Sequence, residues 1–267
     1  MIKKITYPKK SKLLAEESGI HLGDGYMKIR KDKWGTHYEY FCSSHTIDDA
    51  NYREYTKNLM KKLYGLKPTA DRFYGNDSSL TYSSKELIKF KLIIGIPLSP
   101  KKDMVIPEWV KDNKLFLAAF LRGIFDTDGC LSFKSKNCNP HNYPIINIKL
   151  SDKYLIEAIN KSLKLFDLTT SLSKYSQFDK RTNKVYKGYQ IDISGKKNLL
   201  IFLKKIGFKN RKHITKYLIY KMEGYCPPNT TLPQREEMLK ICLGSDLNTR
   251  SRAYETRVLT GLDDPGA

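Results

Sequence analysis

Gly19-Ile-His-Leu-Gly-Asp-Gly25 and Gly123-Ile-Phe-Asp-Thr-Asp-Gly129 share the pattern Gly-Ile-x-x-x-Asp-Gly, and this repeat decides the fold. Each copy closes an apolar stretch with helical spacing, so the sequence predicts two buried helices that end at Asp24 and Asp128. The last glycine of each copy is expected to close its helix in the left-handed conformation. Both carboxylates then lie at negative helix ends, a position that favours a cation beside them.

Small residues predict how the two helices pack. Gly19 and Gly23 stand four residues apart, as do Ala119 and Gly123, so each pair lies on one helical face. Such faces let two backbones approach closely. Helices packed through them bring the two aspartates side by side, and paired carboxylates form a site for hard divalent ions. A single Asp-Gly pair is usually a structural turn, but two copies in matching helical frames favour a functional site.

These residues resemble the LAGLIDADG homing endonucleases in their single-chain, two-motif form. Residues 120–129 are the closer match. Residues 15–25 depart from it by carrying Leu22 where the second copy has Asp126, but they keep the final Asp-Gly. The resemblance extends over about residues 10–244, and it includes a segment that resembles the connection between the two halves in archaeal members.

The resemblance implies an α+β fold made of two pseudo-symmetric repeats of αββαββα type. Each repeat is expected to carry an antiparallel DNA-binding β-saddle, and the repeats are expected to meet at a two-helix interface. Residues 1–110 form the first repeat with its linker, residues 111–244 the second, and residues 245–267 a tail of unassigned role. The sequence supports a duplication independently, because the Asp24–Asp128 spacing of 104 residues and the Gly95–Gly207 spacing of 112 differ by one insertion.

Composition indicates the partner. Lys plus Arg number 48 against 28 for Asp plus Glu, a net charge of +20, which favours a polyanion. The predicted strands interleave Lys and Arg with Tyr, as nucleic-acid-binding strands do. In the first strand Met27 and Ile29 are expected to face the core, while Lys28 and Arg30 face outward. A twisted antiparallel ribbon with a basic face fits the major groove of double-stranded DNA.

The residues expected to contact DNA carry basic, polar or aromatic side chains in predicted strands or hairpins of both halves. They are Lys28, Arg30, Tyr38, Tyr40, Arg72, Lys134, Lys136, Asn147, Lys149, Tyr186, Lys187 and Gln190. Any one such position is more often simply solvated, and only their recurrence in both halves favours DNA contact. In the second half the apolar alternation predicts that Leu131, Phe133, Ile146 and Ile148 form the core.

The resemblance implies the metal site and the reaction. Asp24 and Asp128 are its catalytic metal ligands, with the preceding Gly23 and Thr127 completing the site. Mg2+ is the expected cofactor because carboxylate, water and phosphate oxygens suit a hard cation, with Mn2+ as an alternative. The expected reaction is metal-dependent hydrolysis of double-stranded DNA at a long asymmetric target, one strand cut by each half, which promotes intron mobility.

The resemblance also implies a basic residue near each scissile phosphate. Lys102 and Lys212 are the expected catalytic lysines, since they follow Gly95 and Gly207 at similar spacing. The alternatives are Lys85 and Lys197, which occupy matching repeat positions.

Other function classes are not favoured. The five cysteines are odd in number and contain no Cys-x-x-Cys pair, which argues against a disulfide framework or a zinc ribbon. The five histidines show no metal-ligand spacing. No run approaches 18 apolar residues and the first residues lack a signal-peptide pattern, so we expect a cytoplasmic protein without a membrane partner.

Two alternatives on the same scaffold stay open: an RNA maturase that binds intron RNA, and a DNA-binding protein that has lost cleavage. Both aspartates are present, which argues against lost cleavage. One chain carries both motifs, so we expect a monomer. No protein-splicing junction flanks the motifs, which favours a free-standing or intron-encoded enzyme over an intein.

Overall fold

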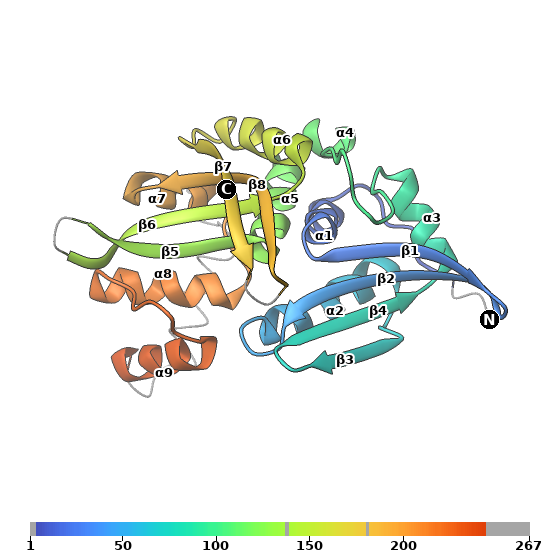
Figure 1. Cartoon of the computed structure of the whole chain (residues 1–267), viewed down its shortest axis with the longest axis horizontal. Helices are drawn as coiled ribbons and strands as arrows, with labels where there is room; N and C mark the ends of the chain where they lie inside the picture. The colour runs from blue at the N-terminus through green and yellow to red at the C-terminus, as the bar shows by residue number, and fades with distance from the viewer. Residues whose placement is uncertain (1–3, 137–138, 180–181, 244–267) are drawn as a thin grey trace, which may run out of the picture. The chain divides into compact units, whose positions relative to one another are not determined.

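Two four-stranded antiparallel sheets, each with helices packed on one face, make up the α+β fold of a computed structural model of the chain (Figure 1). The structure describes residues 4–136, 139–179 and 182–243. The proposed tail at residues 245–267 lies outside these ranges. The chain divides into two compact units, the first ending at Asp128 and the second beginning at Gly129.

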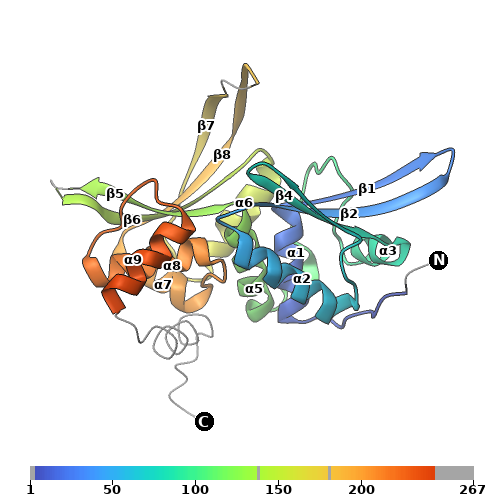
Figure 2. The ribbon, with the colours of Figure 1, turned by 90° about the horizontal axis from the view of Figure 1, so that it is seen from below.

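The first unit has the sheet order β1-β2-β4-β3. Its elements are α1 (Lys12–Leu22), β1 (Gly25–Asp32), β2 (Gly35–His45), α2 (Ala50–Tyr64), β3 (Ala70–Tyr74), β4 (Asp77–Ser83), α3 (Lys85–Ile93), α4 (Glu108–Lys111) and α5 (Lys114–Thr127). Helices α1, α2 and α3 lie on one face of the sheet, and none of these three helices covers its other face (Figure 2).

The second unit repeats this sheet with the order β5-β6-β8-β7. Its elements are β5 (Gly129–Lys136), β6 (Asn139–Leu150), α6 (Lys153–Lys164), β7 (Ser171–Asp179), β8 (Lys184–Ser194), α7 (Lys196–Lys205), α8 (Arg211–Glu223) and α9 (Leu232–Leu243). The expected core residues Leu131, Phe133, Ile146 and Ile148 are all buried. The predicted α+β duplication is therefore confirmed.

The boundary between the units differs from the boundary between the sequence repeats. The second repeat is expected to begin near residue 111, yet α5 belongs to the first unit because it packs along α1. The side chain of Ser11 accepts a hydrogen bond from Leu14 N–H at the start of α1, and Asn113 caps α5 in the same way. The expected two-helix pair thus lies entirely within residues 1–128.

The hairpins run beyond the sheets. Pairing of β2 with β4 ends at Glu39 and Ser83, so the β1–β2 hairpin continues beyond this point as a two-stranded ribbon. Pairing of β6 with β8 ends at Leu150 and Tyr189, so the β7–β8 hairpin does the same. Figure 2 shows β7 and β8 projecting from their sheet. The expectation that Ile29 faces the core is wrong: its ribbon lies past the covering helices, and it is 43% exposed.

Candidate metal centre and nucleic-acid surface

Glycines bring α1 and α5 into backbone contact. A Cβ atom added to Gly19 would lie 2.1 Å from the carbonyl oxygen of Phe120, and one added to Gly123 would lie 2.2 Å from that of Glu16. Real Cβ atoms essentially never approach so closely, so these two positions accept only glycine without movement of the backbone. The close packing expected from the small-residue spacing is confirmed.

This contact brings Asp24 and Asp128 together at the ends of the two helices. A Cβ added to Gly23 would lie 3.2 Å from Oδ2 of Asp128, so that carboxylate lies beside the residue preceding Asp24. Both aspartates are half-buried. Two hard oxygen ligand groups therefore lie next to the carbonyl ends of two helices, and both act electrostatically on the ammonium of Lys101.

The helices do not end as the sequence suggested. Neither Gly25 nor Gly129 has a positive φ, so the expected left-handed closure is wrong. Instead α1 ends at Gly23 with φ −76°, and Gly25 starts β1 directly. Glycine is still required at position 25, because an added Cβ would lie 2.5 Å from the carbonyl oxygen of His21.

Lys101 lies at the same helix end. Its ammonium donates hydrogen bonds to the carbonyl oxygens of Leu22 and Gly23, both at 2.8 Å, and to that of His21 at 3.1 Å. Burial lowers the pKa of Lys101, and the charges of Asp128 and Asp24 act in the opposite direction. The site thus combines two carboxylates with one fixed, partly buried cation.

Sequence reasoning missed Lys101 and named its neighbour. Lys102 is exposed, as are the alternatives Lys85 and Lys197. In the second unit Lys212 is half-buried on α8, and Lys216, which sequence reasoning did not identify, donates to the carbonyl oxygen of Leu131 at 3.0 Å. Burial also lowers the pKa of Lys216. Adjacent lysines in an irregular loop follow no helical or strand periodicity, so the sequence does not indicate which of them is buried.

Glu16 connects three helices of the first unit behind the site. This fully buried residue accepts a hydrogen bond from Tyr55 at 2.7 Å and pairs with Arg122 at 2.6 Å. Because α2 supplies Tyr55 and α5 supplies Arg122, these bonds tie both helices to α1.

The next residue, Glu17, makes a similar set of contacts in another direction. It pairs with Lys91 at 2.5 Å, and both side chains are fully buried. Tyr64 also donates a hydrogen bond to it at 2.9 Å. Burial of these charges with partners fixes the position of α1, and therefore of Asp24.

The donor set fits a metal with few protein ligands. Within the described ranges no three His, Cys, Asp or Glu side chains are grouped to hold an ion, so the two aspartates would need water and phosphate oxygens beside them, which suits Mg2+. The other expected ligands are already engaged: Gly23 O accepts from Lys101, and the hydroxyl of Thr127 donates to Gly123 O and Ile124 O. Asp24 and Asp128 are therefore the strongest ligand candidates.

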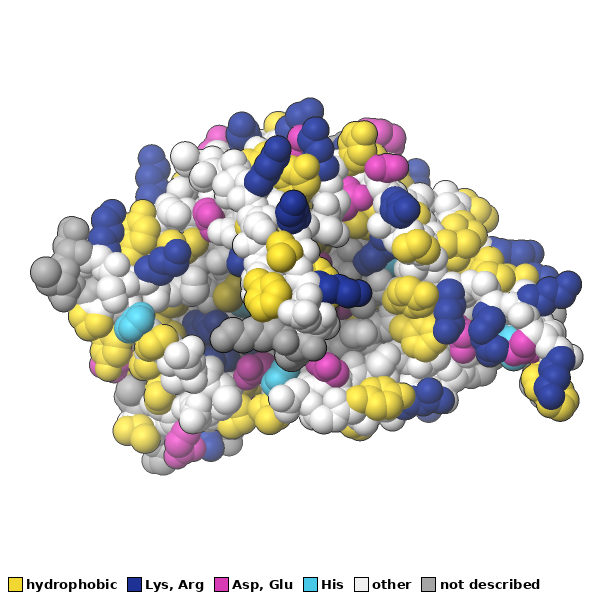
Figure 3. Space-filling view, viewed as in Figure 1, with side chains coloured by type: hydrophobic (Ala, Val, Ile, Leu, Met, Phe, Trp, Pro, Cys, Tyr) yellow, Lys and Arg dark blue, Asp and Glu magenta, His cyan; other side chains and the backbone are white. Residues whose placement is uncertain are grey.

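The uncovered face of the first sheet is basic. In the strand register Lys28 lies opposite Glu39, and Arg72 opposite Ser79, which places both cations on the face away from buried Met27. Arg30 shares this face, being two residues from Lys28. Figure 3 shows Lys and Arg side chains gathered towards the end of the β1–β2 hairpin.

Two tyrosines of this sheet have the opposite orientation. The expectation that Tyr40 contacts DNA is wrong, because Tyr40 is fully buried, stacks on His21 with ring centroids 4.7 Å apart, and lies under the Lys91 ammonium. Tyr38, on the same face of β2, is half-buried with the Lys85 ammonium 5.7 Å from its ring.

The second sheet presents a comparable surface. Asn147 and Lys149 lie opposite Asp192 and Gln190, on the face away from the buried Ile146 and Ile148 of β6. The remaining candidates of this unit, Lys134, Lys136, Tyr186 and Lys187, are all exposed. The strand register places Lys187 on the opposite face from Lys149. Both faces of the β7–β8 ribbon are exposed at this point, because the ribbon continues beyond the sheet.

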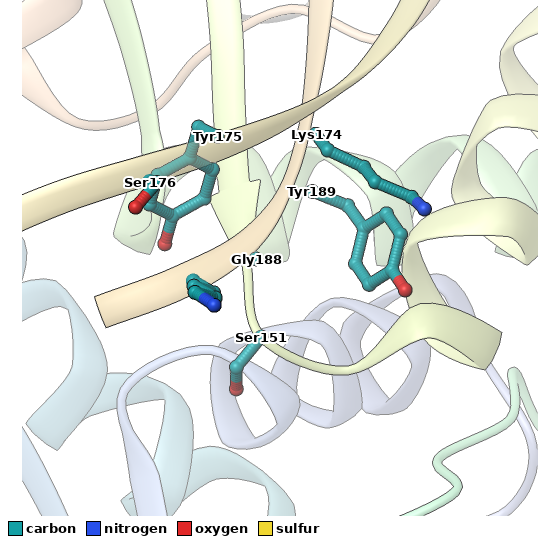
Figure 4. A pocket seen from close by; sticks show the side chains of 7 residues that line it. Ser151, Lys174, Tyr175, Ser176, Gly188 and Tyr189 are labelled. Atoms are coloured by element: carbon teal, nitrogen blue, oxygen red, sulfur yellow. The ribbon is translucent and has the colours of Figure 1, made fainter. Parts of the chain in front are cut away.

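A pocket lies where β6 ends and the β7–β8 ribbon continues (Figure 4). It is lined by Ser151, Lys174, Tyr175, Ser176, Lys187, Gly188 and Tyr189. The ring of Tyr175 covers Gly188, because a Cβ there would lie 2.8 Å from Cε1 of the tyrosine. Two lysines beside tyrosine rings and serine hydroxyls extend the basic surface along the hairpin.

Comparison with known proteins agrees with this geometry. The family model described as a LAGLIDADG-like domain matches residues 115–207. This match lies on the second copy of the motif, which is the copy in closer agreement with the LAGLIDADG pattern.

Among solved structures, the homing endonuclease I-DmoI in complex with DNA and Mn is similar with a TM-score of 0.50 at 17% identity. The match covers 73% of this chain and 96% of that one, and it shows a shared fold.

Two curated relatives come from Methanocaldococcus jannaschii, and each is 28% identical to this chain. Replication factor C small subunit matches over 90% of the chain, and glutamine–fructose-6-phosphate aminotransferase over 72%. The chain spans only 12% and 17% of the length of these relatives, respectively. None of the helices described here is long and apolar enough to cross a membrane.

Proposed function

We propose that this protein is a metal-dependent homing endonuclease that makes double-strand breaks at a long asymmetric DNA target. One observation carries the proposal: Asp24 and Asp128, from separate copies of the motif, lie together at the ends of two helices in glycine contact. Paired carboxylates next to a partly buried lysine form a site suited to phosphodiester hydrolysis.

In this proposal Asp24 and Asp128 hold Mg2+, or Mn2+ in its place. When bound, the divalent ion supplies an activated water and charge stabilisation at the leaving oxygen. Lys101 contributes a positive charge beside the carboxylates, held by three backbone carbonyls. That charge is suited to bind and orient the scissile phosphate without rearrangement. Lys212 or Lys216 takes the corresponding part in the second unit.

The basic faces of both sheets bind the DNA backbone and read base edges. The corresponding strand positions differ, with Lys28 and Arg30 in β1 but Ser132 and Lys134 in β5. An asymmetric target follows from that difference. A single chain carrying both motifs acts as a monomer, which sedimentation with and without DNA would test.

The proposed biological role is mobility of the coding element, such as an intron. Similar segments occupy a small part of two relatives whose named activities are unrelated to each other. A segment shared in this way by unrelated protein chains is what in-frame insertion of a mobile coding element produces. A maturase acting on intron RNA remains the second candidate function, since the same basic sheets would also attract RNA.

The experiment is selection of cleaved sites from a random or genomic DNA library in the presence of Mg2+. We expect one long asymmetric site cut on both strands. Asp24→Asn and Asp128→Asn should each abolish cleavage while keeping DNA affinity within about tenfold, or 1.4 kcal/mol. Asp48→Asn, on the loop before α2, is the matched control. Full cleavage by either active-site variant would overturn the shared-metal proposal, and binding of intron RNA without DNA cleavage would favour the maturase.

A further inference from the structure

The tip of the β1–β2 hairpin carries a solvent-exposed tryptophan. Trp34 is 80% exposed, whereas Trp109, the other tryptophan of the chain, is 9% exposed and donates its indole N–H to the carbonyl oxygen of Ile94. Tryptophan buries a large apolar area when it finds a partner, so Trp34 offers such an area for contact.

The turn that presents Trp34 is well ordered by hydrogen bonds. Asp32 and Gly35 pair across it, and Gly35 adopts φ 124°, which glycine tolerates best. The carboxylate of Asp32 accepts the backbone N–H of Trp34 at 2.8 Å and contacts His37 at 3.1 Å. The bond from Trp34 is the main cause of a lowered pKa at Asp32, which keeps that carboxylate ionised. The backbone that carries the indole is therefore held in place before any partner arrives.

The surroundings of Trp34 are basic. The Lys33 ammonium lies 5.1 Å from its ring centroid, and Lys31 is exposed on the same ribbon, where Arg30 pairs with Asp32. Figure 3 shows hydrophobic and basic side chains together at this tip. A partner complementary to both features is negatively charged and offers flat aromatic groups, which describes nucleic acid.

We propose that Trp34 stacks on a base of the target DNA, or inserts at a base step, at the outer end of the recognised site. The inference deepens the proposed function and rests on it. It assigns to this tip an aromatic contact in addition to the basic contacts of the sheet. Apolar side chains inserted between base steps partially unstack them and kink the duplex in known complexes.

The sequence distance gives the position of this contact. Trp34 lies ten residues after Asp24, and all eight residues of β1 lie between them. At about 3.4 Å per residue the tip reaches roughly 30 Å from the carboxylate. With 3.4 Å per base pair, that corresponds to about nine base pairs from the point of cleavage.

The test uses tryptophan fluorescence of the full chain with the selected target duplex, in Ca2+ or with the cleavage-inactive Asp128→Asn variant. We expect quenching by DNA in the wild-type background and its loss in Trp34→Phe, because Trp109 is buried. Duplexes are then shortened one base pair at a time from either end. Quenching should disappear when one particular end lies closer than about eight base pairs to the cut, since β1 sets that reach.

Affinity gives the second readout. Trp34→Ala should weaken binding of the target about tenfold, the usual range for loss of one stacked base, while Trp34→Phe retains most of the affinity. Ile93→Ala is the matched control, because Ile93 on α3 is 81% exposed but lies outside the sheet. It should leave affinity unchanged.

The outcomes separate this inference from the proposed function. If the wild type binds and cleaves its target while Trp34 fluorescence and Trp34→Ala affinity stay unchanged, only the Trp34 contact is overturned. If Trp34 emission responds to anionic lipid vesicles and not to DNA, the inference is also overturned. If no duplex is bound at all, the proposed function itself fails.

Discussion

The ammonium of Lys101 donates a hydrogen bond to the carbonyl oxygen of Gly23, 2.8 Å away, directly before the carboxylate of Asp24. Lys101→Met should therefore lower the rate of DNA cleavage by about 100-fold or more, because a fixed charge beside a reacting phosphate typically contributes at this level. Single-turnover cleavage at saturating enzyme measures it.

Lys102→Met is the matched control for this prediction, since Lys102 is the exposed neighbour. It should change the cleavage rate less than about threefold. Equal losses of cleavage rate in Lys101→Met and Lys102→Met would contradict the proposal that Lys101 acts at the scissile phosphate.

The glycine contact between α1 and α5 should tolerate no added methyl group. Gly123→Ala places a Cβ against the carbonyl oxygen of Glu16, and relieving that clash should cost at least about 2 kcal/mol of unfolding free energy. Urea unfolding followed by circular dichroism measures the change. Leu115→Ala, at an exposed position on the same helix, should stay within about 0.5 kcal/mol of wild type.

Removing one charge of the buried Glu17–Lys91 pair should lower the free energy of unfolding more than removing both charges. Lys91→Met leaves a buried carboxylate without its cation and should lower stability by about 3–5 kcal/mol. The double variant Glu17→Gln, Lys91→Met neutralises both groups and keeps an acceptor for Tyr64. It should recover at least half of that loss, and a double variant no more stable than the single one would contradict the argument.

His21 should make folding sensitive to acid. Burial lowers the pKa of His21 well below 6.5, with smaller contributions from Lys91 and Lys101, so the folded state keeps the ring neutral. As pH falls below about 6.5 the unfolded chain binds a proton that the folded chain does not, and stability falls by up to about 1.4 kcal/mol per pH unit. His21→Phe preserves the stack on Tyr40 and should flatten the stability profile between pH 7 and pH 5.

Salt dependence should identify phosphate contacts. The Lys149 ammonium lies 5.2 Å from the Tyr175 ring on the basic face of the second sheet. If it neutralises a phosphate, Lys149→Ala should reduce the slope of log affinity against log salt by about one. Lys161→Ala, an exposed lysine on α6, should leave the slope unchanged.

Much of the fold follows from sequence periodicity, because helical spacing and small residues specify both the helices and the face through which they pack. Gly19 and Gly123 illustrate this, since both lie where their spacing predicts. Strand alternation was less informative. Alternation sorts strand residues such as Tyr40 and Ile29 onto two faces. It does not indicate which face the helices cover, or at which residue of the strand the helices stop covering it.

The sequence predicts the two carboxylates of the site but not its lysine. Asp24 and Asp128 are marked by a repeat, whereas Lys101 is selected by the path of an irregular loop. Helix closure was misjudged for a related reason. A glycine after a helix can satisfy a left-handed turn or a close approach of backbone, and at Gly25 the structure uses the second.

The packing of α5 on α1 has an evolutionary consequence. A product of the first sequence copy alone would display the glycine face of α1 to water and lack its second carboxylate, so it could complete itself only by borrowing a helix from another molecule. Covalent fusion of the two copies supplies that second helix within the same chain. It also frees each copy to mutate without its twin, and the divergence is already visible where Leu22 in one motif corresponds to the buried Asp126 in the other.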